Sequence, residues 1–67
     1  MKNHIRDLRE DRGWTQANLG QRVGVTRQAI HAIERLKHDP SISLASRIAS
    51  ALETPIEEVF DLADNNN

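Results

Sequence analysis

A glycine interrupts the amphipathic stretch LGQRVGVTRQAIHAIE at residues 19–34. Apolar residues keep mostly helical spacing on both sides of the break, which indicates two short helices and not one long helix. Gly24 can take the left-handed backbone conformation that ends a helix at no steric cost. Thr26 then offers a hydroxyl to cap the next helix. The stretch therefore predicts one helix over about 16–23 and another from 26 to about 34 or 35, joined by a tight turn.

The residues around the turn fit a helix-turn-helix, in which the second helix crosses close to the first. Such a crossing needs a small residue, and Gly20 supplies it, although glycine inside a helix costs about 1 kcal/mol relative to alanine. Val25 provides the apolar residue after the turn, and Ile30 and Ile33 form the inner stripe of the second helix. The outer face of that helix is polar.

The rest of the chain predicts three more helices and no strand. Asn3 can cap the first helix, which Gly13 ends, and Thr15 can cap the second. Ser41 can cap a fourth helix, whose Leu44, Ile48 and Leu52 recur every four residues.

A fifth helix is indicated by the segment TPIE at residues 54–57. Thr54 stands as cap, Pro55 takes the first helical position, and Glu57 completes a capping box. Residues 63–67 have little to bury and are predicted to be a disordered tail.

Length and composition limit the class of protein. The chain has 67 residues, enough for one small domain, and it has no cysteine, which excludes disulfides and thiolate metal sites. It shows neither a membrane-length apolar run nor a secretory signal, so we expect a cytoplasmic protein. The net charge is −1, but residues 1–38 carry +4 and residues 39–67 carry −5. A positive face can therefore meet a polyanion while the acidic half points elsewhere.

Together these segments resemble small Xre-type regulators of the phage-repressor (Cro/cI) superfamily. The resemblance covers residues 4–62 and rests on IRDLREDRGWTQANLGQRVGVTRQAIHAIE, DPSISLASRIASAL and TPIEEVF. It implies an all-α, five-helix bundle with a helix-turn-helix, a lambda-repressor-like DNA-binding domain over residues 1–62. It also implies a homodimer that binds operator DNA with the helix at about 26–35 in the major groove. An inverted-repeat operator follows from two-fold symmetry, and we favour a repressor because no surface for recruiting polymerase is evident.

The resemblance and the helical positions together assign candidate contacts. Arg27, Gln28 and His31 lie opposite Ile30 and Ile33, so we expect them to reach base edges. Residues at the starts of the two helices and after the second one are expected to bind DNA phosphates. These are Thr15, Gln16, Thr26, Arg35 and Lys37. The resemblance places the dimer interface on the last helix, at Ile56, Val59, Phe60 and Leu62.

The loop after the second helix of the motif departs from the family pattern, which usually has Asn-Gly after the glutamate. Arg35 and Leu36 adopt left-handed turn conformations at a higher cost, so we expect this helix to run a turn longer, with Leu36 buried or facing a partner. Trp14 is expected in the core.

Catalysis has little support in the sequence. His4, His31 and His38 are scattered with no ligand spacing, so we expect no metal site, no cofactor and no enzyme. The alternative function is that of an antitoxin, which binds a toxin protein and represses its own operon. The acidic C-terminal half or an exposed Leu36 would then form the partner surface.

Overall fold

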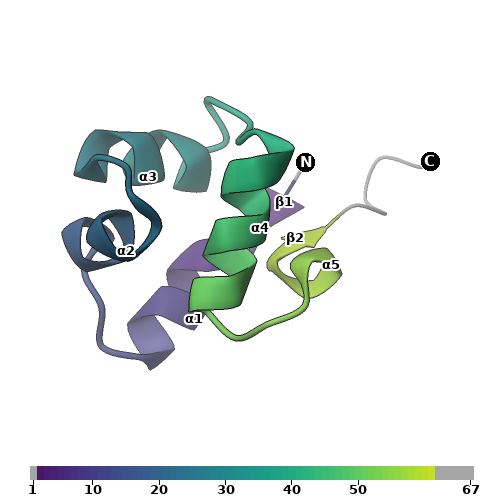
Figure 1. The fold of residues 1–67 in the computed structure, drawn as a ribbon, viewed down its shortest axis with the longest axis horizontal. Coiled ribbons are helices and arrows are strands. Elements are labelled where there is room, and N and C mark those ends of the chain that lie inside the picture. Colours follow the sequence, from purple (N-terminus) through teal and green to yellow (C-terminus); the bar gives the residue numbers. More distant parts are fainter. Residues whose placement is uncertain (1, 62–67) are drawn as a thin grey trace.

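The computed structural model describes residues 2–61, and within them it has five helices and two short strands. In chain order they are β1 (Lys2–Asn3), α1 (Ile5–Asp11), α2 (Gln16–Val23), α3 (Arg27–Glu34), α4 (Ile42–Ala51), α5 (Ile56–Val59) and β2 (Phe60–Asp61). Figure 1 shows α4 in the middle of the molecule, with α2 and α3 on one side of it and α5 on the other. The expected all-α, helix-turn-helix fold class is confirmed.

The helix-turn-helix forms as the sequence predicts. Gly24 ends α2 with φ 84°, in the left-handed region. The hydroxyls of Thr15 and Thr26 accept hydrogen bonds from backbone amides one turn into α2 and α3. Gly20 is buried where α2 approaches the turn, and a Cβ built there would lie 2.6 Å from the Val25 carbonyl oxygen. Glycine at this position therefore permits a backbone approach that no side chain would.

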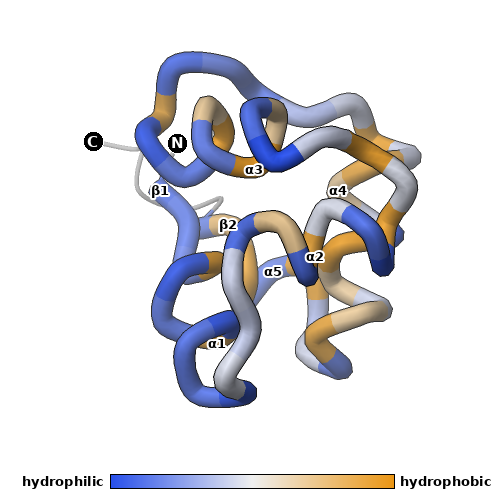
Figure 2. Tube along the Cα trace, turned by 90° about the vertical axis from the view of Figure 1, so that its left-hand side faces the viewer, coloured by the Kyte–Doolittle hydropathy of each residue, from blue (hydrophilic) through white to orange (hydrophobic). Residues whose placement is uncertain are grey.

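The core lies between α4 and the other helices, and each helix contributes one apolar face to it. Its buried hydrophobic members are Ile5, Leu19, Val23, Ile30, Ile33, Ala45, Ile48, Ala49, Leu52, Val59 and Phe60. Trp14 is half-buried and packs against this cluster. Seen from the side, α1 is drawn mostly in hydrophilic blue, as expected of a helix with one inward stripe (Figure 2). Among residues 2–61, no helix has the length and apolar character that crossing a membrane requires.

The expectation of no strand is wrong. Residues 2–3 pair antiparallel with residues 60–61, with Lys2 opposite Asp61 and Asn3 opposite Phe60. The amide of His4 extends the contact by donating to the Val59 carbonyl at 2.7 Å. Strands of two residues carry no periodicity, and so the sequence pattern could not reveal them.

The start of α5 also differs from the expected capping box. The helix begins at Ile56, with Pro55 at its cap position and no side-chain cap. The Thr54 hydroxyl instead donates to the Leu52 carbonyl at 2.9 Å, at the end of α4. Thr54 therefore helps to close the preceding helix, because that helix leaves carbonyls without intrahelical donors.

The end of α3 overturns the expectation of a longer helix. The helix stops at Glu34, and Leu36 takes a left-handed conformation with φ 60°. The amides of Leu36 and Lys37 donate to the Ile33 and Ala32 carbonyls, which closes the helix end. Leu36 is 53% exposed, so it is not part of the core.

Candidate nucleic-acid interface

The exposed face of α3 carries the three side chains predicted to contact bases. Arg27 and Gln28 occupy the first turn and His31 lies one turn later; all three are exposed. On the opposite face Ile30 and Ile33 are 0 and 2% exposed, which fixes the helix on the core. The structure thus brings the three candidates onto one surface, with Arg27 and Gln28 at the N-terminal end of α3.

The starts of α2 and α3 hold the threonine candidates. The hydroxyl oxygen of Thr15 accepts the Asn18 amide at 3.0 Å, and that of Thr26 accepts the Ala29 amide at 3.1 Å. Each hydroxyl oxygen thus accepts a hydrogen bond within its own helix, and its proton remains available to donate to a DNA phosphate. The first amides of each helix also lack intrahelical acceptors, which suits these ends to an anion.

Behind this face lies an ion pair that the sequence analysis did not single out. Arg9 of α1 and Glu34 of α3 meet through two hydrogen bonds, Nε to Oε2 at 2.8 Å and Nη2 to Oε1 at 3.2 Å. Their side chains are 9 and 6% exposed. The hydrogen bond to Glu34 raises the pKa of the Arg9 guanidinium, against the opposing effect of burial. Both residues occupy core-facing helical positions, and opposite charges at such positions are the sequence signal that would have found them.

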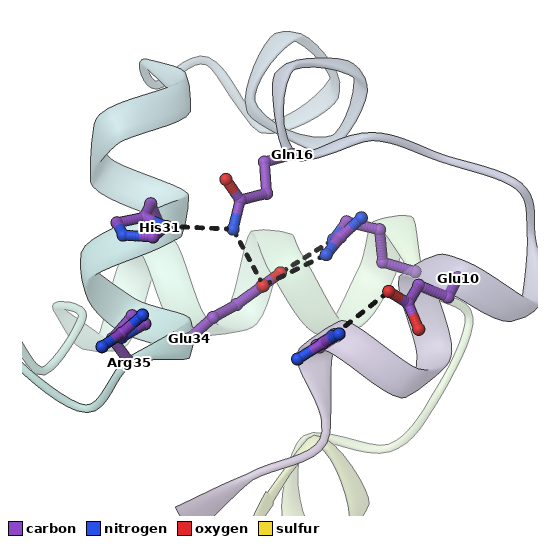
Figure 3. A pocket seen from close by; sticks show the side chains of 7 residues that line it. Glu10, Gln16, His31, Glu34 and Arg35 are labelled. Carbon is purple, nitrogen blue, oxygen red and sulfur yellow. Dashed lines mark hydrogen bonds and ion pairs between the residues drawn. The ribbon is translucent and has the colours of Figure 1, made fainter.

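Gln16 connects this ion pair to α3's exposed face. Its Nε2 donates to Glu34 Oε1 at 3.1 Å and lies 3.4 Å from His31 Nδ1. Figure 3 shows the amide of Gln16 between the His31 ring and the Glu34 carboxylate, across a cleft between α1, the start of α2 and α3. The cleft measures about 370 Å³ and is lined by Arg6, Arg9, Glu10, Gln16, His31, Glu34 and Arg35.

Arg35 and Lys37 are exposed at the end of α3 and in the loop after it. Within residues 2–61 neither side chain forms an ion pair, and the same holds for Arg27. These three cations therefore keep their charge available to a polyanion. Arg22, by contrast, lies over the Trp14 ring, 3.9 Å from its centroid, and is held by a cation–π contact.

The predicted dimer residues do not form one surface. Val59 and Phe60 are 0 and 1% exposed, because they belong to the core of the single chain. Ile56 is half-buried against that core. Leu62 and the predicted tail at 63–67 lie outside the described residues. A second copy could not reach Val59 or Phe60 without opening the fold.

Among residues 2–61 no group of three or more His, Cys, Asp or Glu side chains is placed to hold a metal ion. The exposed face of α3 carries hydrogen-bond donors, and the starts of α2 and α3 and the three cations lie around it. This arrangement suits the grooves and the phosphates of a nucleic acid duplex.

Comparison with known proteins gives the same assignment. The model of the helix-turn-helix family HTH_3 matches residues 5–59. The chain is 44% identical over 66 residues to YgzD of Bacillus subtilis (strain 168), named an uncharacterized HTH-type transcriptional regulator, with 98% of this chain and all of YgzD covered. A protein of Methanothermobacter thermautotrophicus with the same description is 47% identical over 66 residues, which cover 97% of this chain and 96% of its own. By both the motif and these similarities, the chain belongs to the Xre-type helix-turn-helix family.

Proposed function

We propose that the protein is a sequence-specific DNA-binding transcriptional regulator that acts as a homodimer on an inverted-repeat operator. In this proposal α3 enters the major groove, and the starts of α2 and α3 bind the flanking phosphates. Occupation of a promoter by such a domain would block transcription, which is why we propose repression.

The observation that carries the proposal is the outer face of α3. Arg27 and Gln28 are exposed in its first turn, while Ile30 and Ile33 anchor the helix from behind. Arginine can donate two hydrogen bonds to guanine, and glutamine can pair with adenine, each worth about 1 to 3 kcal/mol of discrimination. The family relatives are named transcriptional regulators, which supports the same function.

The role of each residue class is tested by comparing Gln28→Ala with Lys37→Ala on selected DNA. We expect Gln28→Ala to remove the base preference at one position of each half-site. Lys37→Ala should weaken binding to all sequences alike and reduce the salt dependence. An unchanged base preference in Gln28→Ala would show that this part of α3 does not read the groove.

For the homodimer we propose a surface around the loop that follows α3. The exposed large hydrophobic residues among residues 2–61 are Ile42, at 86%, and Leu36, at 53%, and they flank this loop. A two-fold contact around the loop can bury both apolar side chains against their counterparts in the second copy.

The spacing of major grooves is compatible with this surface. Two copies of α3 on one face of DNA lie about 34 Å apart, so the two-fold axis is about 17 Å from the centre of each helix. An eight-residue helix is about 12 Å long, so its end lies about 6 Å from its centre. The loop has to cover the remaining roughly 11 Å, which is within the reach of residues 35–41 at about 3.3 Å per residue. The loop after α3 can therefore meet its copy at the axis.

Ile42→Asp tests this surface by sedimentation. Because Ile42 is almost fully exposed in the single chain, the variant should fold normally but dissociate into monomers at concentrations where the wild type is dimeric. Ser46→Asp, on an exposed position of the same helix, is the matched control and should remain dimeric. An Ile42→Asp variant that dimerises as well as wild type would contradict the proposed surface.

A further inference from the structure

The hydrogen bonds around Gln16 determine which way its side-chain amide faces. Glu34 is held as a carboxylate by two hydrogen bonds from the buried Arg9, and a carboxylate only accepts hydrogen bonds. The Gln16 atom that lies 3.1 Å from Glu34 Oε1 must therefore be the nitrogen. The opposite orientation would place the amide oxygen against a negative charge.

The same nitrogen also lies beside the ring of His31. An amide nitrogen donates two hydrogen bonds and accepts none. In this contact His31 Nδ1, 3.4 Å from the amide nitrogen, is the acceptor, which corresponds to the ring tautomer with its proton on Nε2. Within residues 2–61 no group accepts a hydrogen bond from Nε2, and His31 is exposed.

The arrangement has a second consequence for Gln16. Its amide nitrogen lies within hydrogen-bond distance of two protein atoms, Oε1 of Glu34 and Nδ1 of His31 (Figure 3). The side chain is thus engaged inside the protein, and what Gln16 can offer directly to a phosphate is its backbone amide, at the start of α2.

We propose that Gln16 is a positioning residue, which, held by Glu34, orients His31 so that its Nε2–H donates to an acceptor atom of the DNA. The acceptor is a phosphate oxygen or an acceptor on a base edge, since both take an N–H donor. This inference rests on the proposed DNA-binding function and adds a role that the exposed face alone does not specify.

The experiment compares two replacements of His31 on the duplex that the wild-type protein selects. His31→Gln keeps an N–H donor near the position of Nε2, and His31→Asn places its amide near the position of Nδ1. We expect His31→Gln to bind within about twofold of wild type and His31→Asn to bind about tenfold more weakly, the loss expected for one hydrogen bond. Equal affinities of the two variants would overturn the proposal.

A double-mutant cycle then tests the positioning role of Gln16. Gln16→Met keeps the length of the side chain, the backbone amide and the Arg9–Glu34 pair, but removes both side-chain hydrogen bonds. It should weaken DNA binding several-fold in the wild type and have no effect in the His31→Asn background. Gln21→Met, at an exposed position of the same helix, should bind as wild type. An effect of Gln16→Met that persists without His31 would show that Gln16 does not act through it.

Two further readouts separate the possible outcomes. Nitrogen-15 spectra of the DNA-free protein should show the His31 proton on Nε2, and a proton on Nδ1 would overturn the proposal.

Sequence selection with His31→Asn distinguishes the acceptors, because a lost preference at one position indicates a base edge and a uniform loss indicates a phosphate. If the wild type itself selected no sequence, the proposed function would fail, whereas selection with no effect of the variants would reject this inference alone.

Discussion

The guanidinium of Arg9 and the carboxylate of Glu34 join α1 to α3 through two hydrogen bonds in a nearly solvent-free site. Arg9 Nη1 also donates to the Trp14 carbonyl at 2.7 Å, so one arginine links α1, α3 and the segment before α2. Because Glu34 also accepts a hydrogen bond from Gln16, this pair supports α3 on the side opposite to solvent.

We expect Arg9→Met to lower the free energy of unfolding by about 3 to 5 kcal/mol, because it leaves the Glu34 carboxylate buried and unpaired. Urea denaturation measures the change. Arg6→Met is the matched control: Arg6 pairs with Glu10 at 3.2 Å, but the two side chains are 72 and 52% exposed, and its loss should cost less than about 1 kcal/mol. Equal costs for the two variants would contradict the account.

The double variant Arg9→Met with Glu34→Leu separates charge burial from packing. Replacing both partners by apolar residues removes the unpaired charge, so the double variant should be more stable than Arg9→Met alone. A double variant less stable than Arg9→Met would mean that the other hydrogen bond of Glu34, the one from Gln16, outweighs the cost of burying its unpaired charge.

Glu53 ends α4 in a left-handed conformation with φ 53°, which is costly for a residue with a Cβ. Glu53→Gly should therefore raise the free energy of unfolding by about 0.5 to 1 kcal/mol, after allowance for the greater entropy of glycine in the unfolded chain. Glu53→Ala removes the same charge but keeps the Cβ, so thermal melting should show no comparable gain. A larger gain from alanine than from glycine would show that charge, not backbone conformation, dominates here.

Gly20→Ala tests the close crossing in the helix-turn-helix. Alanine ordinarily stabilises a helix by about 1 kcal/mol relative to glycine, but here its Cβ would meet the Val25 carbonyl oxygen at 2.6 Å. We expect a net loss of stability in chemical denaturation, because a backbone oxygen cannot move away cheaply. Gln21→Ala, the next residue on α2, should be close to neutral. A stabilised Gly20→Ala variant would show that α2 and the turn separate with little cost.

Local chemistry made much of the fold predictable. Thr15, Thr26 and Ser41 cap their helices as their hydroxyls predict, and Gly13 and Gly24 take the positive φ expected of glycine at helix ends. Each of these features depends on a few neighbouring residues, and sequence patterns report such features well.

Tertiary contacts account for the elements that the sequence did not predict. Leu36 adopts a left-handed conformation against its own preference, in a helix end closed by backbone hydrogen bonds. Thr54 turns toward the carbonyl of Leu52 and not toward its own helix. The pairing of residues 2–3 with residues 60–61 joins the two ends of the described chain, which no local pattern specifies.

For the candidate site, periodicity placed Arg27, Gln28 and His31 on one face of α3, and the structure has them there. The partners of Gln16 were not predictable, because Glu34 and His31 come from another helix and their bonds depend on how α2 and α3 cross. The predicted dimer residues Val59 and Phe60 were assigned without knowing that β2 and α5 turn into the core.

The central claim is that α3 reads a DNA sequence, and selection of bound duplexes from a random library tests it most directly. The selection should be run at two salt concentrations, because nonspecific affinity falls steeply as salt rises. We predict an enriched inverted repeat, with half-sites about one helical turn apart, that survives the higher salt. Recovery of no motif, with all binding lost at the higher salt, would contradict the account.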